Sequence, residues 1–141
     1  MTDGPGGGLR VMLVEDEPAN RALIRAILAR ARHPALVGHV LHEAASIGEA
    51  RLILATEAID VILLDVHLPD GSGLDLAAEV RASDRPPVRI VIVSASVLPL
   101  ERSQAVASGA DAFLAKPFGA ADLVDVLVEL VTGAGTGPGT V

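Results

Sequence analysis

The stretch Val61-Ile62-Leu63-Leu64-Asp65 and the turn sequence Leu68-Pro69-Asp70-Gly71-Ser72-Gly73 after it decide the fold. An unbroken aliphatic run, without alternating polar residues, is typical of a strand that is covered on both faces. The run ends at a carboxylate, and the turn that is rich in Pro and Gly leads into a helical pattern. We therefore expect a central strand of a parallel sheet that presents an aspartate at its carboxyl end.

Strand and helix patterns alternate along the rest of the chain. The predicted strands are Leu9–Val14, Val40–Ala44, Asp60–Leu64, Val88–Val93 and Ala112–Ala115. The predicted helices are Pro18–Ala31, Ser46–Thr56, Gly73–Ala82, Pro99–Ser108 and Ala120–Val131. Their ends carry known signals, namely Pro18 in a first turn, Ser46 with Glu49 as a capping box, and Gly109 as a C-cap. Five strand–helix units predict an α/β fold, a doubly wound five-stranded parallel sheet with helices on both faces.

Composition limits the class of protein. The 141 residues suit one domain at residues 9–131, between a flexible N-terminal lead at 1–8 and a disordered tail at 132–141. The absence of cysteine excludes disulfides and thiolate metal sites, and a formal net charge of −7 argues against nucleic-acid binding. No apolar run reaches the length of a membrane span and no signal-peptide pattern is present, so we expect a cytoplasmic location without membrane attachment.

Polar residues follow four of the five predicted strands. Glu15-Asp16 follow the first strand, Asp65 the third, Ser94 the fourth and Lys116 the fifth. Ligands of open α/β sheets bind at the carboxyl ends of the strands, so we expect these side chains to converge there. Clustered carboxylates without His or Cys favour Mg²⁺, while a lysine and a hydroxyl suit the oxygens of a phosphoryl group.

Each of these residues also has a purely structural interpretation. Glu15-Asp16 could cap the first helix, and Asp65 could be an ordinary turn former. Ser94 alone could be a loop hydroxyl, and Lys116 a solvated surface charge. Their coincidence at one edge of the sheet, in the order that phosphoryl transfer requires, favours a functional site.

Four stretches of the chain together resemble response-regulator receiver domains of two-component signalling. They are Val11–Glu17, Val61–Gly73, Ile92–Ala95 and Gly109–Phe118. The resemblance covers about residues 9–131 and implies a flavodoxin-like (βα)5 fold with strand order 2-1-3-4-5. It is similar to the chemotaxis-type single-domain class, and we expect a stand-alone receiver rather than a piece of a longer kinase or regulator.

The resemblance implies catalytic and switching roles. Asp65 resembles the aspartate that accepts the phosphoryl group, and Lys116 resembles the lysine that contacts a phosphoryl oxygen. Ser94 resembles the switch hydroxyl, and Phe113 the aromatic that packs inward behind it. A phenylalanine at this position lacks the hydroxyl contacts of a tyrosine. The Lys116–Pro117 peptide is expected to be cis.

The resemblance also implies a Mg²⁺ site. Asp16, Asp65 and the backbone carbonyl of His67 would bind the ion, and Glu15 would hold a metal-bound water. The His67 side chain lies where the family tunes dephosphorylation. We favour the simpler interpretation, in which this imidazole faces solvent and only the carbonyl contributes.

The implied function is that of a phosphoacceptor in a two-component system or phosphorelay. The donor is expected to be a sensor histidine kinase or a histidine phosphotransfer protein. The chain would not be an enzyme beyond its own phosphorylation and autodephosphorylation. Its output would be a downstream protein or a homodimer, bound through the fourth helix, fifth strand and fifth helix.

Two alternatives differ in class from this interpretation. A Mg²⁺-dependent phosphohydrolase would also use an aspartate nucleophile at a strand end. Haloacid-dehalogenase-type enzymes, however, require a second aspartate where this chain has His67, and they need cap segments that are not evident here. A receiver-like binding module that is not phosphorylated is the second alternative, and the complete set of site residues argues against it.

The last helix is unusually apolar. Between Asp122 and Val131, seven of ten residues are aliphatic, and they spread over about 200° of the helix. Packing on the sheet would leave Val124 and Val128, or else Val126, facing solvent. We therefore expect this helix to join a protein–protein interface.

Overall fold

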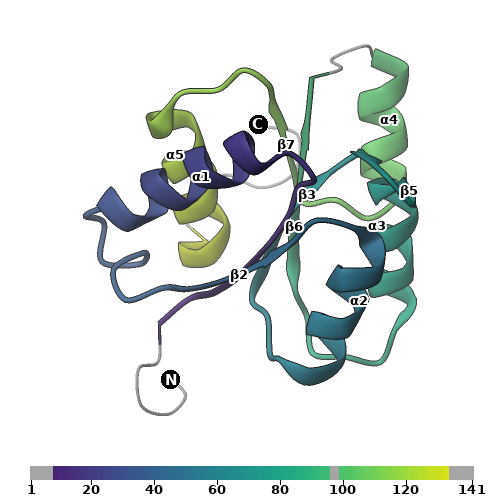
Figure 1. The fold of residues 1–141 in the computed structure, drawn as a ribbon, viewed down its shortest axis with the longest axis horizontal. Helices are drawn as coiled ribbons and strands as arrows, with labels where there is room; N and C mark the ends of the chain where they lie inside the picture. The colour runs from purple at the N-terminus through teal and green to yellow at the C-terminus, as the bar shows by residue number, and fades with distance from the viewer. Residues whose placement is uncertain (1–7, 96–98, 134–141) are drawn as a thin grey trace.

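A five-stranded parallel sheet forms the centre of the computed structural model, which describes residues 8–95 and 99–133, with only the backbone for 99–102 (Figure 1). Its strands are β1 (Arg10–Val14), β2 (Val40–Ala44), β3 (Val61–Asp65), β6 (Arg89–Ser94) and β7 (Ala112–Ala115). They lie in the order β2-β1-β3-β6-β7, and every neighbouring pair is parallel. Counted along the chain this is the order 2-1-3-4-5, so the predicted fold class is confirmed.

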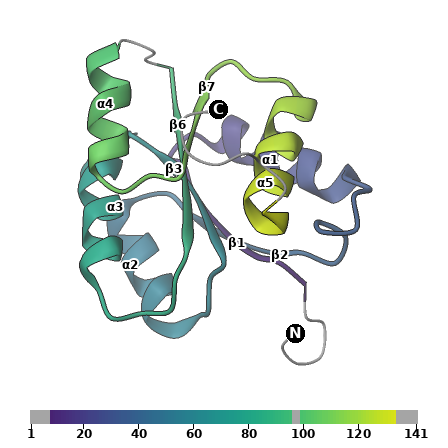
Figure 2. The same ribbon diagram turned by 180° about the vertical axis from the view of Figure 1, so that it is seen from behind.

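Helices cover both faces of the sheet. In the described residues they are α1 (Pro18–Arg30), α2 (Ile47–Thr56), α3 (Gly73–Ala82), α4 (Pro99–Ala107) and α5 (Ala120–Thr132). Figures 1 and 2 show α1 and α5 on one side of the sheet, and α2, α3 and α4 on the other. All of these ends, and those of the strands, lie within one residue of the predicted ones.

The predicted N-cap at Ser46 and C-cap at Gly109 are present, but the capping box is formed only in part, because Glu49 Oε1 accepts from the backbone N–H of Ala45 rather than from that of Ser46. The Ser46 side chain accepts a hydrogen bond from the backbone N–H of Glu49, as an N-cap should. At the end of α4, Gly109 has a φ of +101°, a conformation that a residue with a Cβ adopts only with strain. The N–H of Ala110 then donates back to the carbonyl of Ala105, which ends the helix as a Schellman turn does.

Each face of the sheet packs its own aliphatic core. All five residues of β3 are buried, as its unbroken apolar run predicted. Side chains alternate along a strand, so Ile62 and Leu64 pack toward α2 and α3, whereas Val61 and Leu63 pack toward α1 and α5. A core without Trp or Tyr is thus filled by branched aliphatic residues on both sides.

The expectation of a solvent-facing strip on α5 is wrong. Val126 is buried, and Val124 and Val128 are half-buried against the core on that side of the sheet. The reason is that α5 packs against two neighbours, β7 and α1, and Ile24 and Leu28 of α1 belong to the same core. Two packed neighbours account for the wide apolar face of this helix.

The turn after β3 contains a small antiparallel hairpin, β4 (His67–Leu68) and β5 (Gly71–Ser72), which the sequence did not predict.

The predicted flexible lead at 1–8 and tail at 132–141 lie outside the described residues except for Gly8, Thr132 and Gly133, and Thr132 ends α5. None of the helices in the described part of the chain is long and apolar enough to cross a membrane.

The starts of β1 and β3 are joined by an ion pair. The guanidinium of Arg10 donates to both carboxylate oxygens of Asp60 at 3.0 and 2.9 Å, and the backbone N–H of Arg10 donates to the same carboxylate at 2.8 Å. The Arg10 hydrogen bond holds the pKa of Asp60 below its ordinary value. The carboxylate therefore stabilises the fold above its unfolded-state pKa, and this contribution is lost as the pH falls through the lower folded-state pKa.

We predict that Asp60→Ala lowers the free energy of unfolding by about 1 kcal/mol at pH 7, a modest value because both side chains are about one-third exposed. Urea unfolding at pH 7 and pH 3 measures this difference, and Asp84→Ala, at an exposed loop position, is the control. The difference should shrink at pH 3. An equal difference at both pH values would show that the charge of Asp60 does not matter.

Candidate functional site

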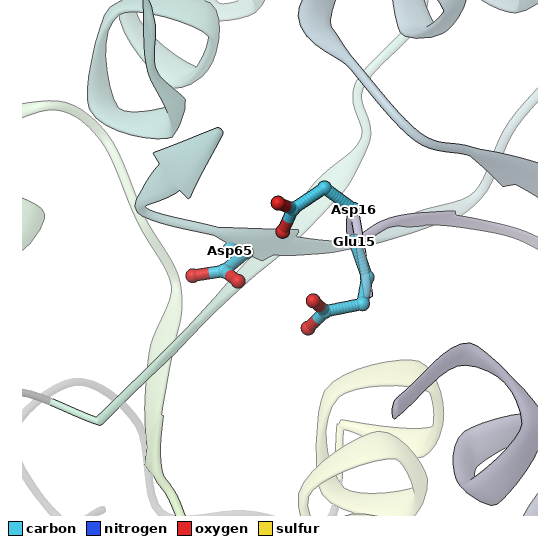
Figure 3. A group of neighbouring side chains, drawn as sticks. All are labelled: Glu15, Asp16 and Asp65. Carbon is cyan, nitrogen blue, oxygen red and sulfur yellow. The ribbon is translucent and has the colours of Figure 1, made fainter. Parts of the chain in front are cut away.

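The strand register brings the predicted site residues to one edge of the sheet. Val14 of β1 lies beside Leu64 of β3, so Glu15 and Asp16 follow at the level of Asp65. Ser94, the last residue of β6, pairs with Ala115 of β7, and Lys116 comes next. Figure 3 shows the carboxylates of Glu15, Asp16 and Asp65 turned toward a shared space between the ends of β1 and β3.

The three carboxylates form a compact cluster. Glu15, Asp16 and Asp65 each offer an oxygen, and these oxygens all lie within 4.8 Å of one another. Glu15 and Asp65 are 2% and 7% exposed, whereas Asp16 is exposed. Partly buried like charges this close repel one another, because the protein interior screens them less than water does. The cluster therefore requires positive charge nearby.

Lys116 supplies part of that charge. Its Nζ donates to Glu15 Oε1 at 2.9 Å and to Asp65 Oδ2 at 3.1 Å. Burial acts to lower the pKa of Lys116, but the bonds to Glu15 and Asp65 outweigh it and raise the pKa above the ordinary value for lysine. The ammonium group is thus charged and lies beside Asp65. The sequence predicted only that the residues following these strands would converge.

Backbone contacts fix Glu15 in this cluster. The backbone N–H of Glu17 donates to Glu15 Oε2 at 3.1 Å, and Arg21 of α1 donates through Nη1 to the Glu15 carbonyl at 2.8 Å. Sequence reasoning missed Arg21, because nothing in the pattern separates it from the other arginines of that helix.

The turn after β3 holds Asp65 in place. The N–H of His67 donates to Asp65 Oδ1 at 3.2 Å, and the N–H of Gly73 donates to the Val66 carbonyl at 2.7 Å. A Cβ on Gly73 would lie only 2.0 Å from the backbone oxygen of Asp65, so this close approach requires glycine. The His67 side chain is exposed, as the simpler interpretation of this residue requires.

The hairpin of this turn is tied to the neighbouring helix. Asp70 accepts hydrogen bonds from the N–H groups of Ile47 and Gly48, both at 2.9 Å, and so caps the start of α2. These backbone donors hold the pKa of the Asp70 carboxyl below its ordinary value. The sequence predicted Asp70 only as a turn residue, because a cap supplied by a residue 22 or 23 positions away leaves no local pattern.

The two predicted switch residues lie on neighbouring strands. Ser94 is 2% exposed, and its carbonyl accepts a hydrogen bond from the N–H of Lys116 at 2.8 Å. Phe113 is half-buried and packs against the core on the α2, α3 and α4 side. The Lys116–Pro117 peptide is cis, which confirms that expectation.

The donor set suits a small, hard cation. Three carboxylates against the single ammonium of Lys116 leave two formal negative charges, which a divalent ion would balance. The ligand atoms are all oxygens, and neither cysteine nor a histidine ring belongs to the group found in the described residues. One ion could contact these oxygens directly or through water. The residues therefore fit Mg²⁺.

Comparison with known sequences finds relatives of this chain. Residues 11–128 match the family described as the response regulator receiver domain. The sensory/regulatory protein RpfC of Xanthomonas campestris pv. campestris is 33% identical over 125 residues, which are 86% of this chain and 16% of RpfC. The KDP operon transcriptional regulatory protein KdpE of Escherichia coli is 34% identical over 113 residues, 80% of this chain and 47% of KdpE. The chain therefore spans less than half the length of each relative.

A solved structure with the same fold carries a metal ion. The receiver domain of the sensor histidine kinase PA1611 from Pseudomonas aeruginosa PAO1 matches with a TM-score of 0.77 and 29% sequence identity. The match covers 89% of this chain and 98% of that chain. In that protein a magnesium ion is coordinated in the active-site cleft.

The close approach at Gly73 gives a stability prediction. Gly73→Ala should lower the free energy of unfolding by about 3 kcal/mol, because the backbone at Asp65 must move to admit a Cβ. The matched control is Gly48→Ala, where a Cβ would meet its nearest atom at an ordinary 3.6 Å. This control should be neutral or stabilising by about 0.5 kcal/mol, because alanine favours a helix. Equal effects in urea unfolding would contradict the packing at Gly73.

Proposed function

We propose, for a chain that belongs to the response regulator receiver domain family, that Asp65 is the residue that accepts the phosphoryl group. The observation that carries the proposal is the Lys116 ammonium, which lies 3.1 Å from Asp65 Oδ2 at the end of a central strand. A nucleophilic carboxylate beside a fixed positive charge is what transfer of an anionic phosphoryl group needs. Members of this family receive a phosphoryl group in two-component signalling, and this is the function of the chain.

The proposed reaction is a displacement at phosphorus. The carboxylate of Asp65 attacks the phosphorus of a phosphohistidine, so that an O–P bond forms while the P–N bond breaks. The electron pair of the broken bond stays on the imidazole nitrogen, which takes up a proton. Lys116 faces the phosphoryl oxygens and offsets their charge in the transition state. The N–H of His67, 3.2 Å from Asp65 Oδ1, keeps the nucleophile oriented.

The proposed metal ligands are the carboxylates of Asp16 and Asp65 and the backbone carbonyl of His67, with Glu15 bound through a water. When bound, Mg²⁺ supplies positive charge to the incoming phosphoryl oxygens. Asp16 is exposed at the mouth of the cluster, where it can reach the ion directly. The indirect role of Glu15 follows the resemblance to the family, since burial and a bond to Lys116 are common to Glu15 and Asp65.

The proposed donor is a sensor histidine kinase or a histidine phosphotransfer protein. The support comes from the relatives, since RpfC is a sensory/regulatory protein and the PA1611 domain belongs to a sensor histidine kinase. Receiver domains are phosphoacceptors rather than enzymes in the usual sense. Autodephosphorylation of Asp65 is part of the proposal, and the cytoplasmic location remains a prediction.

The proposed output is a shift between two conformations. Phosphorylation would place nearly two negative charges beside Ser94 and Lys116. Ser94 would turn toward the phosphoryl group and Phe113 would follow it inward, which changes the face formed by α4, β7 and α5. A nearly complete switch requires a differential free energy of about 5.5 kcal/mol between the two states. The output partner binds this face in one state better than in the other.

The alternative phosphohydrolase is not favoured. The family match covers residues 11–128, and His67 stands where such an enzyme would need its second aspartate. The receiver-like module without phosphorylation is not favoured either, because the acidic cluster, Lys116 and Ser94 all lie at the same sheet edge.

The central test is chemical labelling of Asp65. Incubation with acetyl phosphate and Mg²⁺, followed by reductive trapping and mass spectrometry, should place the adduct on Asp65 alone. In Asp65→Asn the labelling should fall to background, because an amide cannot form the acyl phosphate. Label that persists at wild-type level in Asp65→Asn would refute the assignment.

The proposed ligand roles predict an order of Mg²⁺ affinities. Asp16→Ala should weaken binding more than Glu15→Ala, by about tenfold in Kd, because only Asp16 is assigned a direct bond to the ion. Titration of Mg²⁺ followed by calorimetry measures both constants. Equal losses, or a larger loss in Glu15→Ala, would reverse the assigned roles.

A further inference from the structure

A groove lies along β7 on the proposed output face, next to α5. Its volume is about 400 Å³, and β7 is the last strand of the sheet. Figure 2 shows β7 between α4 and α5 in the view from behind. The apolar part of the groove is lined by residues of β7, of the turn after it and of α5, namely Phe113, Leu114, Ala115, Phe118 and Val126.

The other side of the groove is acidic. Asp122, Asp125 and Glu129 line it, and their spacing of three and four residues puts them in one row along α5. One oxygen of Asp122 accepts a hydrogen bond from the N–H of Gly119 at 2.8 Å, while Asp125 and Glu129 are exposed. No basic side chain lines this groove in the part of the chain that the structure describes. The row thus presents uncompensated negative charge beside an apolar surface.

We propose that this groove binds a cationic, amphipathic segment of a partner protein. The apolar side chains of that segment would pack on Phe113 and Phe118, which are both half-buried, and its Lys or Arg side chains would face the acidic row of α5. Charge complementarity selects this occupant. The inference deepens the proposed output face and rests on it, because it names the chemistry of the partner that this face binds.

The same charges disfavour a second copy of this chain as the occupant. A two-fold symmetric contact through this face brings the acidic row of one α5 near that of the other. Like charges that face each other across an interface oppose association, and the formal net charge of −7 adds to the repulsion. Of the two outputs expected from the sequence, the structure therefore favours the separate partner.

The groove is directly connected to the phosphorylation site. Ala115 lines the groove, and the next residue, Lys116, bonds to Asp65 and Glu15. Movement of the Lys116 ammonium toward a phosphoryl group would therefore act on the strand that forms the groove. The end of β7 would therefore contact both the proposed acceptor Asp65, through Lys116, and the partner segment in the groove.

The test uses short fluorescein-labelled peptides and the whole chain, without Mg²⁺ or a phosphodonor. The probe peptide combines Leu and Lys in helical register, and two controls replace either every Lys by Glu or every Leu by Ser. Fluorescence anisotropy should show that the probe binds about tenfold tighter than either control. Equal binding of the probe and the Lys–Ser control would overturn the inference, because it would show attraction by net charge alone.

Two substitutions with the same change in net charge locate the contact. Asp125→Lys should weaken binding of the probe peptide about tenfold, whereas Asp84→Lys, at an exposed loop position remote in sequence from α5, should change it less than about twofold. Thermal unfolding checks that both variants fold. Equal losses in the two variants would overturn the proposed groove.

Sedimentation of the whole chain tests the second copy directly. The account predicts a monomer at micromolar concentration, and a dimer that Asp125→Lys alters would overturn it. Absence of peptide binding, with labelling of Asp65 intact, would refute this inference and leave the proposed function standing. Loss of Asp65 labelling with peptide binding intact would refute the proposed phosphoacceptor role of Asp65 and leave the peptide-binding groove standing.

Discussion

Charge balance at the carboxyl end of the sheet is the constraint on which the site depends. Glu15, Asp16 and Asp65 lie within 4.8 Å of one another, and two of them are buried. Lys116 bonds to both buried carboxylates. Its positive charge reduces the repulsion between them but does not neutralise the cluster. The remaining negative charge suits a divalent cation. A bound cation would also lower the repulsion that a further anionic group meets at this site.

The fold delivers these charges with little freedom. Parallel strands in register end at one edge, so Glu15, Asp65 and Lys116 meet there although 50 or more residues separate each from the next. The buried aliphatic residues of β3 hold Asp65 at that edge, and Gly73 lets the chain turn against its backbone. The cost of bringing like charges together is met by the packing of the two aliphatic cores on either face of the sheet.

The sequence was sufficient to predict the fold and the convergence of Glu15, Asp65 and Lys116 at the carboxyl ends of the strands. Unbroken apolar runs, caps and turn residues are local signals, and they placed every main-sheet strand and every helix of the described residues within one residue. The contacts of Arg21 with Glu15 and of Asp70 with α2 were missed, because they join segments whose proximity only the folded chain creates. The burial of α5 was misjudged for the same reason, since α1 covers part of its apolar face.

A crystal structure of the chain with beryllofluoride and Mg²⁺ tests the account most directly. The account predicts the beryllofluoride group on a carboxylate oxygen of Asp65, Lys116 Nζ within hydrogen-bonding distance of a fluorine, and the ion bound by Asp16 and Asp65. It also predicts that the Ser94 hydroxyl turns toward the fluorines. A beryllofluoride group bound to another carboxylate, or an ion held away from Asp16 and Asp65, would contradict it.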